Sequence, residues 1–297
     1  MNIEQGPSFG PNTSEQESKE EVSPEENIMS ASEYKDVEHE VPYVYKLEDE
    51  TGEIEYFGSP HVNDPEDEVF SQIEQTFGQT RPDIVLVENM PLGETEDIRQ
   101  NAQMYSREEV IKGLGESGFA IQLAAQNNTE FDSPEPSDEE LFAHLEEKFT
   151  REEIFAWCVL RALAEYHQET SSNSDQENNF ERYIEPVIEE FTEVTDWKDF
   201  DYSYEHAIKV GEQLLSQSIT PEQETDAERM VDPTPWEDQE QTVLNRIGEE
   251  ASLFRDEHIV KRIADLKEQN TYQSIFVVYG ASHAVMQEQA LRELFNE

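Results

Sequence analysis

The sequence predicts an α/β fold in which helices flank a mixed central β-sheet and a helical insertion interrupts the chain. Two short continuous apolar runs, residues 84–87 and 274–279, have the length and composition of strands that are covered on both faces. The β-rich segments 41–47 and 53–57 surround a polar turn and predict a hairpin. From about residue 137 to 220, apolar residues recur at helical spacing, which predicts the insertion.

The N-terminal segment is predicted to differ from the rest of the chain. Residues 1–38 are polar, acidic and rich in Ser, Pro, Glu and Asn, so they cannot bury enough apolar surface to offset the cost of ordering. We expect a disordered acidic tail there, followed by a single α/β domain over residues 39–297.

The first half of that domain is predicted to contain a strand–helix–strand unit. After the hairpin, residues 63–65 are predicted to start a helix with Pro65 near its first turn. The helix has an apolar stripe at residues 69, 70, 73 and 77. The apolar run 84–87 then follows as a central strand.

Capping patterns predict the next two helices. Ser106-Arg-Glu-Glu109 opens a helix toward Ala125 that contains three glycines, explained by close backbone packing or by a break near Gly115. Residues 129–132 are predicted to form a short strand, and Pro134-Glu-Pro136 an extended segment. Ser137-Asp-Glu-Glu140 opens the helical insertion.

The C-terminal part is predicted to return to the sheet. Residues 221–236 are expected to form an irregular loop that contains prolines, and residues 243–267 a long helix. The strand at 274–279 follows, and a helix at 285–295 closes the chain.

The charge balance excludes several classes of partner. The chain of 297 residues has 70 acidic and 20 basic residues and a formal net charge of −50. Such a surface repels phosphates and anionic lipid heads, so we expect no nucleic acid and no membrane among its partners. Adaptation to high salt and a lineage bias with an acidic tail both explain the acidity.

The sequence predicts neither a secreted nor a membrane-spanning protein, and no reactive thiol. The start of the sequence has no basic and apolar signal pattern, and no run approaches the length of a membrane helix, which predicts a cytoplasmic protein. The single cysteine, Cys158, lies in an apolar run and is expected to be a buried, inert thiol.

Two matching motifs are the strongest functional signal. Gly58-Ser-Pro-His61 and Gly280-Ala-Ser-His283 each follow a predicted strand and precede a helix. Ligands of open α/β folds bind beyond the carboxyl ends of strands, so we expect the two histidines to share one site. Imidazole is a general base near neutral pH and a common metal ligand.

Charged residues near these strand ends complete the predicted site. Glu88 ends the apolar strand 84–87 and is expected at the same edge of the sheet. Glu116 and Glu135 are further candidate acids. Arg255, on the long helix, is expected either to contact a substrate carboxylate or an oxyanion, or to pair with one of the many acids.

In these residues the chain resembles the TraB/PrgY–TIKI superfamily, with its erythromycin-esterase and ChaN-like relatives, over about residues 41–297. The resemblance is carried by the two Gly-x-x-His motifs, the strand-end Glu88 and Arg255 on the helix before the second motif. It implies a two-half architecture with the site between the halves. By position it implies a site of His61, Glu88, Arg255 and His283.

The family resemblance implies hydrolysis of an ester or amide bond of a small molecule or peptide. Its TIKI-like members are metal-dependent proteases, and its erythromycin esterases open a lactone. His61, Glu88 and His283 suit Zn, Mn or Co by ligand type, and a metal-free mechanism with His61 as base and Glu88 orienting it is the alternative. A second alternative is a non-catalytic protein that carries haem or iron or sequesters a signal peptide, with Tyr56, Tyr279 and His283 as candidate haem contacts.

Overall fold

The computed structural model describes residues 27–90, 95–172, 180–219, 229, 231–234 and 240–296. Its strands are β1 (Tyr43–Asp49), β2 (Gly52–Ser59), β3 (Ile84–Val87), β4 (Glu130–Asp132) and β5 (Ser274–Gly280). Its helices include α1 (Ala31–Tyr34), α2 (Glu68–Thr80), α3 (Thr95–Met104), α4 (Arg107–Asn127) and α5 (Asp138–Glu146). They continue with α6 (Arg151–Ser172), α7 (Phe180–Thr195), α8 (Tyr204–Leu215), α10 (Val243–Gln269) and α11 (Ala281–Leu294).

The strands form one mixed sheet in the order β1-β2-β5-β3-β4, which confirms the predicted α/β class. β1 pairs with β2 antiparallel as the predicted hairpin, and the other neighbours are parallel. Because β5 lies between β2 and β3, the two Gly-x-x-His strands are adjacent, with Ser59 opposite Gly280. This register brings the ends of the two motifs together.

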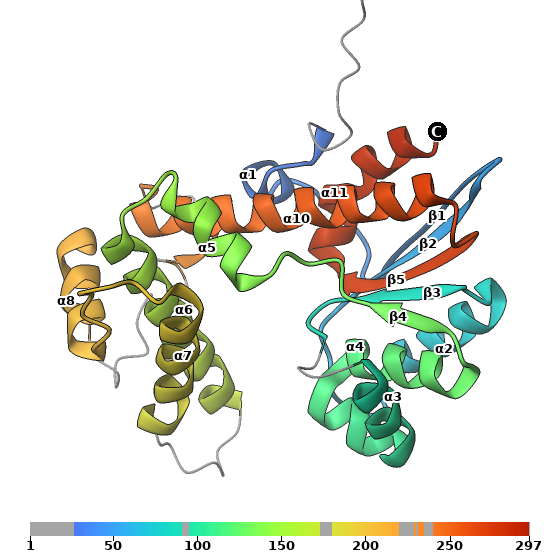
Figure 1. Cartoon of the computed structure of the whole chain (residues 1–297), viewed down its shortest axis with the longest axis horizontal. Helices are drawn as coiled ribbons and strands as arrows, with labels where there is room; N and C mark the ends of the chain where they lie inside the picture. Colours follow the sequence, from blue (N-terminus) through green and yellow to red (C-terminus); the bar gives the residue numbers. More distant parts are fainter. Residues whose placement is uncertain are drawn as a thin grey trace, which may run out of the picture.

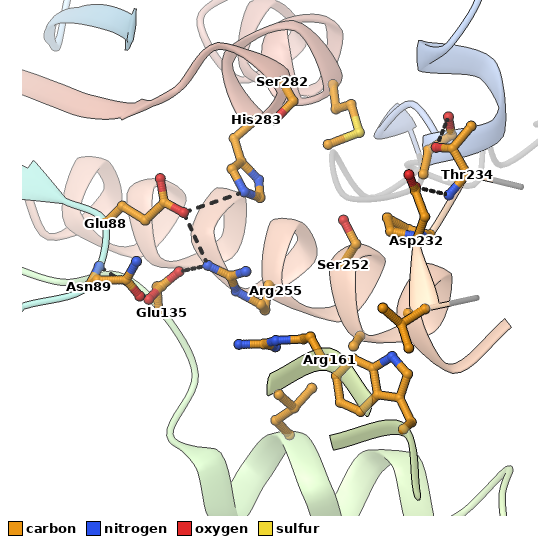
Figure 2. Close-up of a pocket in the computed structure, with 18 of the residues that line it drawn as sticks. Glu88, Asn89, Glu135, Arg161, Asp232, Thr234, Ser252, Arg255, Ser282 and His283 are labelled. Carbon is orange, nitrogen blue, oxygen red and sulfur yellow. Dashed lines mark hydrogen bonds and ion pairs between the residues drawn. The ribbon is translucent and has the colours of Figure 1, made fainter. Parts of the chain in front are cut away.

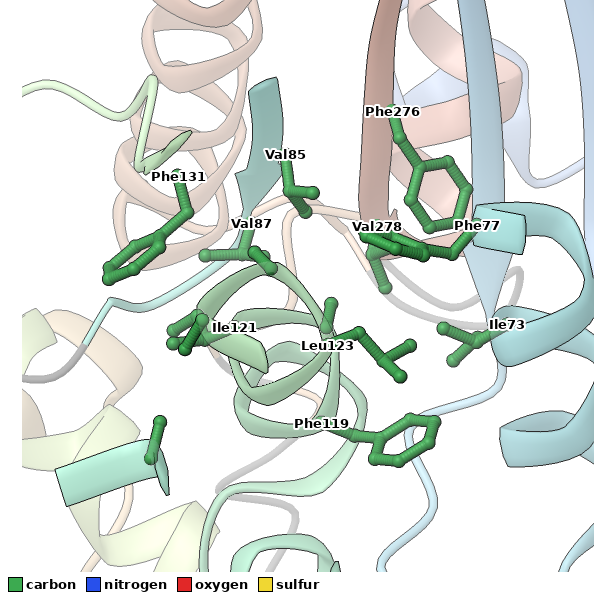
Figure 3. Packing of buried hydrophobic residues seen from close by; sticks show 14 of the residues in the cluster. Ile73, Phe77, Val85, Val87, Phe119, Ile121, Leu123, Phe131, Phe276 and Val278 are labelled. Carbon is green, nitrogen blue, oxygen red and sulfur yellow. The ribbon is translucent and has the colours of Figure 1, made fainter. Parts of the chain in front are cut away.

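Helices cover both faces of the sheet (Figure 1). On one face, α2, α3 and α4 bury the odd-numbered side chains of β3, Val85 and Val87, together with Phe276 and Val278 of β5 (Figure 3). On the other face, α10 and α11 bury Leu86 and its neighbours. Both faces of β3 are therefore apolar, as its continuous run of buried residues requires.

The insertion forms a second core. α5, α6, α7 and α8 pack around Phe155 and Leu160 and against the first half of α10, while the second half of α10 packs on the sheet. A single 27-residue helix thus belongs to both cores (Figure 1). This arrangement fixes the insertion beside the carboxyl edge of the sheet.

Three expected boundaries were wrong. Residues 27–38, expected in the tail, include α1, which has a Ser30–Glu33 capping box and buries Ala31. The helix expected after the hairpin, α2, starts at Glu68 rather than at residues 63–65, because the Asp67 side chain caps it. The last helix starts at Ala281, directly after β5, rather than at residue 285.

Other predicted features agree with the structure or lie outside its described residues. α4 is broken at Gly115, which has φ +56°; this is one of the two explanations offered for its glycines. Residues 1–26 of the expected tail and most of the expected loop 221–236 lie outside the described residues. Within the described ranges, no helix has the length and apolar character needed to span a membrane.

Candidate functional site

The predicted site residues follow different parallel strands at one edge of the sheet. His61 follows β2, Glu88 follows β3, Glu135 follows β4 and His283 follows β5. The carboxyl ends of parallel strands are the usual location of ligand sites in open α/β sheets. Arg255 reaches the same edge from α10, close to Glu88 and Glu135.

The two motif glycines make this convergence sterically feasible. A Cβ built on Gly58 would lie 2.7 Å from the Cβ of Ala284 and 2.9 Å from the Cα of Ala281, so Gly58 lets α11 pack directly on β2. A Cβ on Gly280 would lie 2.3 Å from Nε2 of His61. Each glycine therefore leaves room for residues of the other motif or of the helix that follows it.

Glu88 lies at the centre of the cluster. Its Oε2 accepts a hydrogen bond from the Gly280 N–H at 3.0 Å, and its Oε1 lies 3.6 Å from Nη2 of Arg255 and 3.9 Å from Nε2 of His283. Burial alone would raise the pKa of this carboxyl. The positive charges of His283 and Arg255, together with the hydrogen bond from Gly280, outweigh burial, so the pKa of Glu88 is lowered and the group is ionised.

His283 is held by a buried carboxylate that the sequence analysis did not identify. Nδ1 of His283 lies 2.6 Å from Oδ1 of Asp256, whose residue is 1% exposed. The same oxygen accepts from Nε2 of Gln287 at 2.6 Å, and Gln287 accepts from the hydroxyl of Tyr56 at 3.0 Å. This chain fixes the orientation of the ring and directs Nε2 of His283 toward Glu88.

The environment favours the charged form of His283. Burial would lower the pKa of the imidazole, but the nearby carboxylates of Asp256 and Glu88 raise it more strongly. The pKa of His283 is consequently raised above its ordinary value. His283 thus has the character of a cation that faces the cluster, next to Arg255.

Asp256 could have been found from the sequence. Together with Ile259, Val260 and Ile263 it occupies the buried stripe of α10 at helical spacing. An acid at an apolar-stripe position is the signal, because an unpaired carboxylate there would be very costly. The sequence analysis predicted the preceding residue, Arg255, as part of the site instead, because basic residues are scarce in this chain.

His61 differs from His283 in being exposed and conformationally unusual. Its backbone has φ +60°, a region uncommon for residues other than glycine, although His is enriched there. The backbone N–H of Val62 donates to Oε1 of the buried Glu116 at 2.7 Å. Glu116, which follows the break at Gly115, therefore holds the backbone directly after His61 in place.

Arg255 is bound between two carboxylates. It forms an ion pair with Glu135 in addition to its contact with Glu88, and Glu135 also accepts from the N–H of Asn89 at 3.4 Å. Burial would lower the pKa of Arg255, but these acids raise it, so the guanidinium stays charged. His258, one turn further along α10, contacts the Pro134 carbonyl oxygen at 2.9 Å.

A pocket of about 670 Å³ opens beside this cluster, between the sheet edge and the helical insertion (Figure 2). Its inner wall includes four of the predicted residues: Glu88, Glu135, Arg255 and His283. Its outer wall is formed by residues of α5, α6, α10 and the segment 231–234. His61 and Glu116 are not part of this lining; they lie at the end of β2 and in α4.

The residues fit a metal ion by type but not by placement. Within the described ranges, no three His, Cys, Asp or Glu side chains are arranged to hold one ion. The Oε1 atom of Glu88, which faces His283, already has Arg255 3.6 Å away. Of the candidate haem contacts, Tyr56 and Tyr279 are buried, at 0% and 1% exposure, and Tyr56 donates to Gln287.

Comparison of the chain with protein-family models, with curated proteins and with solved structures finds no match. The resemblance to the TraB/PrgY–TIKI superfamily therefore stays a prediction.

Proposed function

We propose that the chain is a hydrolase that cleaves an ester or amide bond at the carboxyl edge of its sheet. The observation that carries this proposal is that the end of β5 brings two imidazoles close to the Glu88 carboxylate: His283 at 3.9 Å, and His61 beside Gly280, whose N–H the carboxylate accepts. One is exposed, and the other is fixed by Asp256 and faces the pocket beside Arg255. A base and a cationic oxyanion site are the two functions that such a hydrolysis requires.

His61 is assigned as the general base that takes a proton from the attacking water. It must be neutral in this role, and its exposed ring is open to solvent. Glu88 is a poor base because its pKa is lowered, so its role is to orient the two imidazoles and Arg255 through its charge. Glu116 is a positioning residue that keeps His61 over Gly280.

His283 and Arg255 are assigned to the carbonyl oxygen of the substrate. Arg255 is charged and the environment favours the charged form of His283; both line the pocket, and both lie within 4 Å of the same Glu88 oxygen. As the water adds to the carbonyl carbon, the oxygen gains negative charge, which the two groups stabilise. His283 in its charged form can then donate its Nε2 proton to the leaving group as the bond to the carbonyl carbon breaks. His61 releases the proton it took from water to solvent, and His283 takes one up again before the next cycle.

The proposed mechanism does not require a metal ion. A divalent cation bound by His61, Glu88 and His283 stays a prediction from ligand type, as does the two-half architecture of the erythromycin-esterase and ChaN-like relatives. If such an ion were bound, it would polarise the carbonyl or lower the pKa of a water.

The test is a panel of aryl esters, lactones and peptide amides, assayed with the full chain before and after treatment with a chelator. We expect hydrolysis of at least one class, with His61→Ala and His283→Ala each lowering kcat by about 10²- to 10⁴-fold. His206→Ala is the matched control, because His206 lies on α8 and is not part of the pocket lining.

Four results would refute or redirect the proposal. No turnover on the whole panel, or turnover that survives both substitutions, would refute the hydrolase. Loss of turnover with the chelator, together with metal found by elemental analysis, would replace the metal-free roles given above. An absorbance band of haem in the purified protein would favour the non-catalytic alternative.

A further inference from the structure

The outer wall of the pocket has an unsatisfied hydrogen-bond donor. Trp157, on α6, lines the pocket and is 4% exposed, and its indole N–H has no acceptor in the described part of the chain. A buried donor without an acceptor is costly and rare in folded proteins. An acceptor from outside the chain would remove that cost.

A second tryptophan in the insertion shows what a satisfied arrangement looks like. Arg151 lies over the ring of Trp197 at 5.2 Å and pairs with Glu146, and Glu146 also accepts from the indole N–H of Trp197 at 2.6 Å. Arg151, Trp197 and Glu146 thus contact one another in a closed set, meaning that the indole N–H has its acceptor within the group. No pocket residue is involved in it.

The similar group that lines the pocket, Arg161, Trp157 and Glu165, lacks this last contact, because its glutamate does not accept from the indole N–H. Arg161 lies over the ring of Trp157 at 5.5 Å and pairs with Glu165, but Glu165 does not accept from the indole. The Arg161 side chain is 55% exposed, and a surface pair of this kind contributes little stability. Arg161 can therefore turn aside when a ligand approaches the ring, or bind that ligand itself.

The charges around Trp157 limit what the acceptor can be. The same wall carries the carboxylates of Asp138, Glu165 and Asp232 against the single guanidinium of Arg161, so an anionic group would be repelled. The wall also offers the hydroxyl of Ser252 (Figure 2). Hydroxyl groups both donate and accept, which suits a wall where carboxylates and donors are mixed.

We propose that the outer half of this pocket binds a polyhydroxylated ring without negative charge, such as a sugar, with Trp157 and Arg161 as its principal contacts. The oxygen atoms of the sugar, in its ring and its hydroxyl groups, would accept hydrogen bonds from the Trp157 N–H and from Arg161. Its hydroxyl groups would donate hydrogen bonds to Glu165 and Asp138. Together with the proposed function, on which this substrate class rests, the substrate is an ester or amide of a hydroxylated or glycosylated molecule. The bond to be cleaved lies at His283 and the ring at α6.

The test is saturation-transfer NMR on the full chain with methyl glucoside and methyl glucuronide, which differ only in a hydroxymethyl and a carboxylate group. We expect binding of the glucoside and at least about 5-fold weaker binding of the glucuronide. Trp157→Phe removes the donor and should weaken glucoside binding about 5- to 10-fold. Trp197→Phe, the same change at the closed set, should leave binding unchanged.

Arg161→Gln and its control Arg151→Gln repeat the comparison if Trp157→Phe does not fold. Equal or tighter binding of the glucuronide, no glucoside signal, or equal effects of the paired substitutions would overturn the proposal. Binding is measured without turnover. A chain that binds the glucoside but hydrolyses nothing would support the sugar site and refute the hydrolase. A chain that hydrolyses an ester or amide but does not bind the glucoside would support the hydrolase and refute the sugar site.

Discussion

Replacing Asp256 with Asn tests how His283 is held. The substitution keeps the volume of the side chain but removes the charge from an oxygen that accepts two hydrogen bonds of 2.6 Å in a residue that is 1% exposed. A hydrogen bond to a charged group contributes about 1.5–3 kcal/mol and a neutral one about 1 kcal/mol. We expect Asp256→Asn to lower the free energy of unfolding by about 2–3 kcal/mol while His283 is charged.

The cost should depend on pH in a direction that the structure fixes. Because the pKa of His283 is raised on folding, the stabilisation of its charged form is complete below the unfolded pKa of about 6.5 and is lost as pH rises through the folded pKa. Urea denaturation of wild type and variant at about pH 6 and about pH 9 measures the difference. The cost should be smaller at the higher pH.

Asp83→Asn is the matched control. Asp83 also accepts two hydrogen bonds, from the backbone N–H groups of Gln273 at 2.8 Å and Ser274 at 3.1 Å, but no histidine contacts it. Its cost should be the same at both pH values. If Asp256→Asn has a cost that does not change with pH, the buried carboxylate does not hold a charged His283, and the assigned role of His283 fails.

Three further predictions concern single residues. Gly280→Ala places a Cβ 2.3 Å from Nε2 of His61 and should lower hydrolysis at least about 10²-fold. In contrast, Gly78→Ala, with open space around the new Cβ, should leave hydrolysis unchanged and raise the free energy of unfolding in urea by up to about 1 kcal/mol. Equal loss of hydrolysis in the two variants would contradict the packing argument. Glu116→Gln weakens the charged acceptor that holds the backbone after His61, so kcat should fall with KM little changed in steady-state assays, and a change in KM alone would argue against a positioning role. Cys158 is only partly exposed and burial raises the pKa of its thiol to about 12, so a thiol reagent should label the folded chain much more slowly than the chain in urea, and equal labelling rates would contradict this.

The sheet and its flanking helices were predictable because their signals are local. The apolar runs of β3 and β5 and the capping boxes before α4 and α5 depend only on residues close in sequence. The start of α11 was not predictable in this way. Gly280 is followed at once by helix because His283 and Gln287 face Asp256 on another element.

The candidate site was predictable where a residue ends a strand. His61 and Glu88 follow the ends of β2 and β3, and His283 lies in the first turn of α11 directly after β5. The parallel pairing of β2, β5 and β3 brings all three to one edge. Asp256 and Arg161 lie within helices, where the sequence gives no indication of the partner they face. Their roles depend on the packing of α10 and of the insertion against the sheet, which only the three-dimensional structure supplies.

The most direct test of the proposed mechanism is rescue of the two histidine variants by added imidazole. His61 is exposed and is assigned as the base, whereas His283 is buried and bound to Asp256. Hydrolysis lost in His61→Ala should therefore be restored in part by imidazole, and hydrolysis lost in His283→Ala should not. Full activity of His61→Ala, or rescue of His283→Ala alone, would contradict the assignment of His61 as the general base.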